Sequence, residues 1–433
     1  MRLLAIVGRP NVGKSTLYNR LIGEREAIID DTSGVTRDRL YGLSDWNGIA
    51  FTVVDTGGFV QRSEDVFESA VREQVYIAIK EAHAILFIVD VTTGITDLDE
   101  DIAFILRKSE TPVLLVVNKV DNAQRMIDAN EFWKLGFENT FFISSLSGSG
   151  TGELLDAVVK QFPQEEEKML EDFPRIAVLG QPNVGKSSMV NALLGEERNI
   201  VTEVPGTTRD AIHSLYNRFG KSFYLIDTAG IRKKSKVHEN LEFYSVIRAI
   251  KAIEASDVCL LLIDAQTGLE SQDMNIFDMI VKRKKGLVIL VNKWDLIQKD
   301  KNSVKDYTQE IKRKIAPFSD VPVLFVSALT KQRILKSIEA AFDVYQNKRQ
   351  KVKTSILNKL LSEWVEKHPP PVNKGRAIKI KYVTQIPAAY PIFAFYCNHP
   401  RYVKPSYKNY LENQIRKNFD FSGSPISISF REK

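Results

Sequence analysis

One eight-residue stretch occurs twice in this chain of 433 residues, with a single difference between the copies. Each copy follows a short apolar run and precedes a helical pattern that ends near a glycine, Gly23 or Gly195. A strand, a glycine-rich loop and a helix in this order are the context of a phosphate-binding P-loop, and a chance match does not recur in the same context. The copies comprise Gly8, Arg9, Pro10, Asn11, Val12, Gly13, Lys14 and Ser15, and Gly180, Gln181, Pro182, Asn183, Val184, Gly185, Lys186 and Ser187.

The repeat extends well beyond these loops. Residues 8–55 align with residues 180–227 at an offset of 172 without an insertion, and later motifs align at an offset of 174. A period this long indicates duplicated domains. Strand-like apolar runs alternate with helical patterns in both copies, which predicts an α/β fold with a mostly parallel sheet covered by helices on both faces. These runs are 3–7, 51–54, 84–89 and 113–117, and then 176–179, 223–226, 258–263 and 287–291.

The length predicts two to four domains. We expect a first α/β domain over 1–163, an acidic linker over 164–173 and a second α/β domain over 174–347, the two copies ending in helices near 153–162 and 331–347. The remainder, 348–433, has the pattern of a small α+β domain. Its expected elements are strands at 377–383, 392–397 and 426–430 and a helix at 406–418.

The composition, with 44% hydrophobic and 26% charged residues, is typical of a soluble globular protein. The apolar runs are strand-sized, so we expect no membrane span, and the first of them leads into the P-loop and is no signal peptide. Cys259 and Cys397 lack metal-binding spacing, and we expect both to be core thiols. These features predict a cytoplasmic protein.

The C-terminal segment 348–433 is strongly basic, with 17 Lys and Arg against 5 Asp and Glu, whereas the rest carries a net −6. Tyrosines are interleaved with these charges, which favours a polyanionic partner such as RNA over a solvated surface that binds nothing. A second basic run, 232–236, is either another contact or a solvated loop. The tyrosines are Tyr382, Tyr390, Tyr396, Tyr402, Tyr407 and Tyr410.

The P-loop residues have distinct expected roles. The glycines let backbone N–H groups face phosphate oxygens at a helix N-terminus. Lys14 and Lys186 bridge the outer phosphates, and the hydroxyls of Ser15 and Ser187 are placed to bind Mg²⁺. Later residues complete the expected metal sites, whose members are Ser15, Thr36, Asp55, Ser187, Thr208 and Asp227.

Two further motifs point to a guanine nucleotide. A carboxylate after Asn-Lys accepts hydrogen bonds from the N1–H and the amine of guanine, a donor pair that adenine lacks. An Asp-x-x-Gly stretch resembles the loop that meets the γ-phosphate, and this loop switches after hydrolysis. Ser144–Leu146 and Ser327–Leu329 are expected to support the base. The motifs are Asp55, Thr56, Gly57 and Gly58; Asp227, Thr228, Ala229 and Gly230; Asn118, Lys119, Val120 and Asp121; and Asn292, Lys293, Trp294 and Asp295.

Phe59 and Ile231 follow the Asp-x-x-Gly motifs, where many GTPases have a glutamine that orients water. The tandem motifs and basic tail together resemble the EngA (Der) family of ribosome-assembly GTPases. The resemblance implies GTP hydrolysis to GDP, a KH-like C-terminal domain, and maturation of the large ribosomal subunit through rRNA. In related GTPases with an apolar residue at this position, a K⁺ ion held by the P-loop asparagine assists catalysis; this carries over to Asn11 and Asn183, whose other reading is a turn former.

The catalytic set that follows from the resemblance and the motifs is Lys14, Asn11, Thr36, Gly58, Lys186, Asn183, Thr208 and Gly230. Three features depart from the family pattern: Ser145 replaces alanine, 331–333 lacks glycine, and 373–376 does not match GxxG. We expect a monomer with Mg²⁺ and K⁺ as cofactors. Two alternatives stay open. One is an RNA-binding scaffold with one slow G domain. The other is a role in tRNA modification, and only this second alternative is disfavoured by the absence of a C-terminal cysteine.

Overall fold

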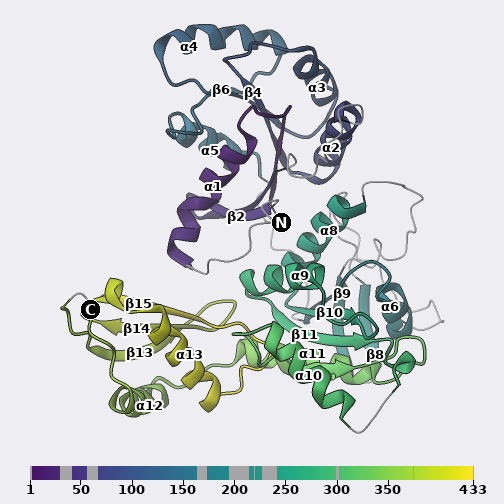
Figure 1. Ribbon diagram of the computed structural model, residues 1–433, viewed down its shortest axis with the longest axis vertical. Helices are drawn as coiled ribbons and strands as arrows, with labels where there is room; N and C mark the ends of the chain where they lie inside the picture. Colours follow the sequence, from purple (N-terminus) through teal and green to yellow (C-terminus); the bar gives the residue numbers. More distant parts are fainter. Residues whose placement is uncertain are drawn as a thin grey trace. The chain divides into compact units, whose positions relative to one another are not determined.

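The structure is a computed structural model that describes residues 2–29, 41–55, 67–162, 173–194, 214–218, 220–226, 241–298, 302–373 and 375–432. It contains two compact units (Figure 1), one formed by Met1–Met169 with Glu242–Tyr244 and the other by Leu170–Leu241 and Ser245–Lys433. The first unit holds the first copy of the repeat, and the second unit holds the second copy together with the basic C-terminal segment.

The first unit is built on a six-stranded sheet in the order β2-β3-β1-β4-β5-β6. Every neighbouring pair is parallel except β2 and β3, which form a hairpin. The central strand β4 is buried along its whole length, as expected for a strand covered on both faces. The strands are β1 (Leu3–Val7), β2 (Tyr41–Trp46), β3 (Ile49–Asp55), β4 (Ala84–Asp90), β5 (Val113–Asn118) and β6 (Thr140–Phe142).

Helices lie on both faces of this sheet (Figure 1), and the sheet separates the apolar side chains into two clusters. Leu4 and Ile6 of β1 face one cluster, whereas Ala5 and Val7 face the other, because successive residues of a strand point to opposite faces. α1 runs past Gly23, so the helix end expected there is wrong; one glycine costs a helix about 1 kcal/mol, which does not end it. The helices are α1 (Lys14–Ile29), α2 (Phe67–Glu81), α3 (Asp97–Arg107), α4 (Ala123–Asp128), η3 (Ala129–Leu135) and α5 (Thr151–Lys160).

The second unit repeats this architecture with the sheet order β12-β11-β10-β7-β9-β8. Again only the hairpin pair, β8 and β9, is antiparallel. The expected pair of mostly parallel α/β domains is therefore confirmed. The elements are β7 (Arg175–Leu179), α6 (Lys186–Leu194), β8 (Ser214–Arg218), β9 (Lys221–Ile226), α8 (Leu241–Ala255), β10 (Val258–Asp264), α9 (Ser271–Lys282), β11 (Gly286–Asn292), η4 (Trp294–Leu296), α10 (Ser303–Lys314), β12 (Val323–Phe325) and α11 (Ile334–Arg349).

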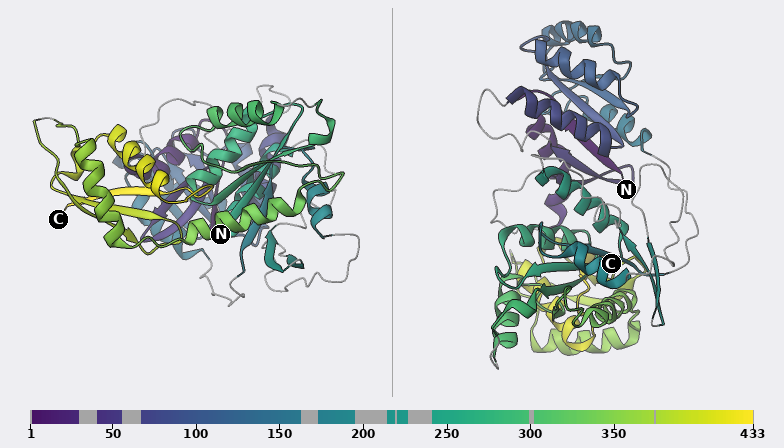
Figure 2. Two further views of the ribbon diagram at one scale, coloured as in Figure 1. Left: turned by 90° about the horizontal axis from the view of Figure 1, so that it is seen from below. Right: turned by 90° about the vertical axis from the view of Figure 1, so that its right-hand side faces the viewer.

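The basic segment forms a three-stranded sheet in the order β13-β14-β15, with α12 and α13 packed on it in one apolar cluster (Figure 2). The sequence patterns above do not include α12, although Leu357, Leu361 and Trp364 recur at helical spacing and are buried. Tyr407 is buried in this cluster, and the half-buried Tyr410 packs against it. The elements are α12 (Thr354–Lys367), β13 (Ile380–Ile386), β14 (Ile392–Cys397), η5 (Pro400–Tyr402), α13 (Pro405–Asn418) and β15 (Ser427–Glu432).

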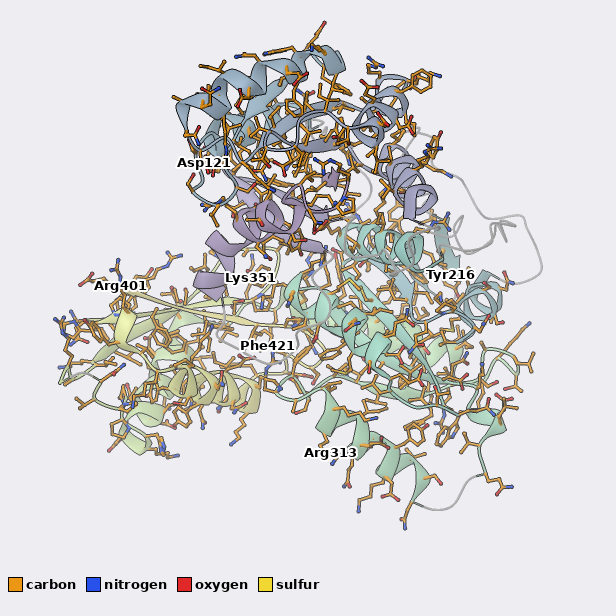
Figure 3. All side chains as sticks on the ribbon, turned by 45° about the horizontal axis from the view of Figure 1, so that its top comes forward. Asp121, Tyr216, Arg313, Lys351, Arg401 and Phe421 are labelled. Carbon is orange, nitrogen blue, oxygen red and sulfur yellow. The ribbon has the colours of Figure 1, made fainter. Side chains whose placement is uncertain are left out.

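Residues 420–424, which precede β15, attach the C-terminal sheet to the second α/β domain near Phe421 (Figure 3). The backbone N–H of Leu287 donates to the carbonyl of Gly423 at 2.8 Å. Arg416 on α13 forms a 2.6 Å ion pair with Asp320 and lies over the ring of Phe318. These contacts explain why the two parts form one compact unit.

Both cysteines are free and buried, as expected. Burial raises the pKa of the Cys259 thiol to about 11, so this thiol is unreactive at neutral pH. Among the described residues, no helix is long and apolar enough to cross a membrane.

Candidate functional site

The sheet topology gathers the sequence motifs at one edge of each α/β domain. The P-loop follows β1, while Asp55 and Asn118 are the last residues of β3 and β5. In the second domain the P-loop follows β7, and Asn292 ends β11. Carboxyl ends of parallel strands form the ligand-binding edge in such sheets, so the geometry brings together residues over 100 positions apart in sequence.

The P-loop lysine lies in the centre of each loop. Nζ of Lys14 donates to the carbonyls of Gly8 and Arg9 at 2.8 and 2.7 Å. Nζ of Lys186 donates to Gly180 and Gln181 at 2.8 and 2.5 Å. Burial lowers the pKa of each lysine to about 8. The charge of a nearby carboxylate, Asp55 for Lys14 and Asp273 for Lys186, raises the pKa but does not cancel the effect of burial. Such a poorly solvated cation is ready to bind a phosphate anion.

The glycines of the loop are required by close backbone contacts. A Cβ on Gly8 would lie 2.3 Å from the carbonyl oxygen of Ile88, and one on Gly13 would lie 2.3 Å from Nδ2 of Asn118. Gly180 and Gly185 meet equivalent contacts at 2.3 Å. The asparagine between the glycines, Asn11 or Asn183, has a left-handed φ of 64° in both loops, which asparagine tolerates better than most residues. The turn-forming role of Asn11 and Asn183 is thus visible in the backbone.

An asparagine connects each P-loop to the loop after the last strand. Nδ2 of Asn118 donates to the carbonyl of Val12 at 2.8 Å, and its Oδ1 accepts from N and Oγ of Ser145, both at 2.9 Å. Asn292 makes the matching contacts with Val184 at 2.7 Å and with N of Ala328 at 2.9 Å. Ser145 therefore keeps the backbone contact of the alanine that it replaces and adds a second hydrogen bond.

The carboxylate of Asp121, which the sequence predicts to select the base, lies just beyond β5 and is half-exposed (Figure 3). Both of its oxygens accept from Nη1 of Arg125 at 2.7 Å. The neighbouring Lys119 forms an ion pair with Asp90 at 2.5 Å. Burial raises the pKa of Asp90, but the hydrogen bonds from Lys119 and Thr92 outweigh burial, so the pKa is lowered overall. Lys119 and Asp121 are thus each paired with an opposite charge at this edge of the sheet.

Asp90 and Asp264, which are not among the residues predicted from the motifs, orient the lysines of the two Asn-Lys motifs. Lys293 pairs with Asp264 at 2.6 Å. The signal was present, because each aspartate ends a buried strand, β4 or β10, and the two are 174 residues apart, like Lys119 and Lys293. Arg20 was also missed: it donates to the carbonyl of Ser145 at 2.6 Å and holds this loop from α1.

Two expected Mg²⁺ ligands of the first domain are in contact. Oγ of Ser15 donates to Oδ2 of Asp55 at 2.8 Å, and Asp55 is 2% exposed. A hydroxyl and a carboxylate are the hard oxygen donors that Mg²⁺ prefers, so these residues fit the ion. Other expected residues lie outside the described part of the chain: Thr36, Thr56, Gly57, Gly58, Phe59, Thr208, Asp227, Thr228, Ala229, Gly230 and Ile231, together with the basic run 232–236 and all but the last residue of the linker.

The loop after Leu329 keeps its shape without glycine. In the first domain Gly148 and Gly150 have φ values of 90° and 75°. At the same places in the second domain Lys331 and Arg333 both have a φ of 58°. The helix that follows each loop, α5 or α11, starts at the same point, so the missing glycines do not alter the architecture.

Comparison with known proteins decides the family. Residues 3–119 and 175–293 match the family described as 50S ribosome-binding GTPase, and residues 351–431 match the KH-domain-like C-terminal domain of EngA bacterial GTPase enzymes. A protein named GTPase Der from Flavobacterium johnsoniae is 57% identical over 433 residues, which are 100% of this chain and 99% of that protein. The chain belongs to the Der family of GTPases.

Other Der relatives agree. GTPase Der from Christiangramia forsetii is 56% identical and GTPase Der from Bacteroides fragilis 55% identical, each over 100% of this chain and 99% of the relative. Among solved structures, Era from Aquifex aeolicus with GDP and aluminium fluoride matches with a TM-score of 0.32 and 22% identity, over 60% of this chain and 93% of that one. Membership of the Der family makes this chain a GTP-binding GTP hydrolase with tandem G domains and a KH-like domain.

Proposed function

We propose that both G domains hydrolyse GTP to GDP and phosphate, and that the protein thereby acts in assembly of the large ribosomal subunit. The observation that carries the first part is the connection made by Asn118 and Asn292, which joins the P-loop to the loop after the last strand through the same two backbone contacts in both domains. A module kept only for its surface would not need this connection twice. The proposed domain boundaries are 1–163, 174–347 and 348–433, with 164–173 as the linker.

Base selection is assigned to Asp121 and Asp295. Their carboxylates accept from N1–H and the amine of guanine, and a nucleotide without these donors leaves the carboxylate unpaired. Asp121 exchanges its contact with Arg125 for the base or keeps it on one oxygen. Lys119 and Lys293, held by Asp90 and Asp264, lay their aliphatic stems along the base.

Phosphate binding is assigned to Lys14 and Lys186, which replace two backbone carbonyls with phosphate oxygens on binding. Mg²⁺, when bound, neutralises the charge of the outer phosphates. The residues that hold it are Ser15, Thr36 and Asp55 in the first domain and Ser187, Thr208 and Asp227 in the second. The backbone N–H groups of Gly58 and Gly230 meet the γ-phosphate in this scheme.

Catalysis is assigned to positioning and charge rather than to a glutamine. Asn11 and Asn183 are exposed at the tip of each P-loop and hold their left-handed turn. We assign to their amide oxygens one ligand of a K⁺ ion that stabilises charge on the phosphates. Asn11→Gly tests this, because glycine adopts the same φ and removes only the amide. The variant should bind GDP normally and lose stimulation by KCl over NaCl; stimulation equal to wild type would remove Asn11 from the scheme.

Turnover itself is tested with Lys14→Ala and Lys186→Ala. Each should lower kcat/KM of its own site by about a hundredfold or more, because a charge that contacts the transferring phosphoryl group is lost. Lys134→Ala, which changes an exposed side chain of η3, is the matched control and should leave kcat/KM unchanged. Steady-state hydrolysis that neither P-loop change lowers would show that the hydrolysis is wrongly assigned to these sites.

The ribosomal part rests on the basic KH-like domain, and the partner proposed is rRNA in the large subunit, bound by a cytoplasmic monomer. Arg376, Lys379 and Lys381 are exposed around the start of β13. Co-sedimentation with ribosomal subunits in GDP, GTP and a non-hydrolysable analogue should show association with the large subunit that depends on the nucleotide. Lys379→Glu with Lys381→Glu should weaken this association. The slope of log K against the logarithm of the salt concentration should become less steep by about one unit per lost phosphate contact.

Lys305→Glu with Lys312→Glu on exposed α10 reverses the same number of charges in the second G domain and serves as the control. Association with the small subunit alone, or binding indifferent to nucleotide in every variant, would contradict the large-subunit proposal.

A further inference from the structure

The two P-loops differ at one position, Arg9 in the first and Gln181 in the second. Nε of Arg9 lies 3.1 Å from Oδ2 of Asp99, and its Nη2 donates to Oγ1 of Thr93. The Arg9 side chain is 14% exposed and that of Asp99 is fully buried. This ion pair fastens the first P-loop to the N-terminal turn of α3.

Asp99 is fixed by its own helix as well. Its Oδ2 accepts from N and Oγ1 of Thr96 at 3.1 and 2.8 Å in a capping box. A buried carboxylate is tolerated when it is paired and hydrogen-bonded, and Arg9 supplies the paired charge. The corner formed by Arg9, Thr96 and Asp99 is therefore electrically neutral.

The same corner in the second domain has a different charge. At the 174-residue offset, Glu270 replaces Thr96 and Asp273 replaces Asp99. Nε2 of Gln181 donates to Oε2 of Glu270 at 3.2 Å, and Asp273, 2% exposed, caps α9 through N of Glu270 at 3.1 Å. Two carboxylates thus lie beside this P-loop, and the side chain that replaces Arg9 brings no charge.

These corners act on the phosphate-binding lysines in opposite ways. Burial has the largest effect on the pKa of Lys14; the charge of Asp55 raises this pKa, and the charge of Arg9 opposes Asp55 and lowers it. The charge of Asp273 instead attracts the ammonium of Lys186 and raises its pKa against burial. Burial raises the pKa of Asp273 itself, and the neighbouring Glu270 adds to this shift. The first corner, in which Arg9 is paired with Asp99, thus adds no net charge beside its P-loop, whereas the second corner places two carboxylates where a phosphate would arrive.

We propose that Arg9, positioned by Asp99, makes the first G domain the tighter nucleotide site, and that Gln181, Glu270 and Asp273 make the second site weaker. The inference rests on the proposed use of both P-loops for GTP and GDP. Arg9 acts here as a positioning and electrostatic residue, because it holds the loop and sets the local charge. The affinities should differ about five- to twentyfold at low salt, the effect of one or two partly screened charges.

The test measures GDP affinity at each site of the full chain. Asp295→Asn removes guanine recognition from the second site, so GDP then reports the first; Asp121→Asn isolates the second in the same way. The exchange Gln181→Arg with Glu270→Thr should tighten GDP at the second site about five- to twentyfold at low salt. Arg9→Gln should weaken the first site, and Arg9→Lys should retain most of the wild-type affinity.

The salt dependence of GDP binding distinguishes an electrostatic cause of the affinity difference from a steric one. The difference between the sites should shrink as ionic strength rises from 0.01 to 0.5 M, because the Debye length falls from about 30 Å to less than 8 Å. Lys134→Gln, which removes one exposed charge on η3, should leave the GDP affinity of the first site unchanged.

Equal affinities at low salt would overturn the inference, as would a difference that salt does not change or an exchange at Gln181 and Glu270 without effect. A chain that binds GDP at neither site would instead overturn the proposed function, so the two failures are distinguishable.

Discussion

At the scale of single residues, Asp121 and Asp295 decide which base each site accepts. Asparagine at either position replaces one acceptor with an N–H donor, which no longer matches the amine of guanine but matches the second carbonyl of xanthine. We expect Asp121→Asn to weaken GDP at the first site by about a hundredfold or more and to admit xanthosine diphosphate. Competition binding with both nucleotides checks this. Asp128→Asn, on the exposed C-terminal end of α4, is the control. Unchanged preference for GDP would remove Asp121 from the base site.

Lys348 on α11 is a buried cation that the nucleotide sites do not use. It is 8% exposed and its Nζ lies 3.4 Å from the carbonyl of Asp257. Burial, with the charge of Lys285, lowers the pKa of Lys348 from 10.5 to about 8. The folded state therefore binds fewer protons than the unfolded state between pH 8 and 10.5, so this residue makes stability rise with pH in that window. Below pH 8 the penalty for the buried charge is fully present.

Lys348→Met should accordingly raise the free energy of unfolding by about 1–3 kcal/mol at pH 7. The gain should shrink as the pH rises from 8 towards 10.5, because the wild-type amine is then neutral in the folded state. Chemical denaturation at pH 7 and pH 10 measures both values. Lys336→Met, exposed on the same helix, should show no such pH dependence. A gain that is equal at the two pH values would contradict a charge-based penalty.

At the scale of elements, the loop before α11 shows that a conformation can persist after its preferred residue is lost. Lys331 and Arg333 occupy left-handed φ values at which the first domain has glycine. A non-glycine residue there costs about 1–2 kcal/mol, partly offset by the greater flexibility of glycine in the unfolded chain. The surrounding strand, helix and Asn292 contacts hold the loop in shape.

Lys331→Gly should therefore stabilise the second unit by about 0.5–1 kcal/mol, since glycine removes the steric cost at this φ. Lys336→Gly, the same substitution in the interior of α11, should destabilise the second unit by about 1 kcal/mol, because glycine is unfavourable at a helical φ. Thermal unfolding of the two variants provides the comparison. Loss of stability in both would show that the loop is not strained.

At the scale of the molecule, the second G domain and the KH-like domain share one compact unit, and Gly423 lies where they meet. Its φ is 68°, and a Cβ there would lie 2.5 Å from Cγ2 of Val344 and 2.6 Å from the carbonyl oxygen of Leu287. Gly423→Ala should therefore disturb the attachment of the KH-like domain to the second G domain.

Gly375 is a matched control, because its φ is 71° and a Cβ would meet nothing within 4 Å. Both alanine variants carry the backbone cost, but only Gly423→Ala adds the steric conflict. We expect Gly423→Ala to lose about 1–3 kcal/mol more than Gly375→Ala in calorimetry of the full chain. Equal losses would mean that the contact at Gly423 is not important for stability.

Much of the fold and part of the site could be predicted from the sequence, because both have local signatures. Apolar runs such as 84–89 are buried strands wherever they occur in a parallel sheet, and the P-loop glycines are needed by local backbone geometry. The 172-residue offset alone indicated two similar domains. α12 was missed although Leu357, Leu361 and Trp364 have helical spacing, since the polar residues between them obscure so short a pattern.

The tertiary structure decided what depends on residues far apart in the chain. Sequence could assign Asn118 and Asn292 to a motif, but only the sheet brings their amides to Val12 and Val184 over more than 100 residues. The Arg9–Asp99 pair and its replacement by Gln181 and Glu270 also required the fold, because no local pattern links position 9 with position 99. Motifs and periodicity are properties of neighbours along the chain, whereas the charge around each phosphate loop depends on which helix the sheet places beside it.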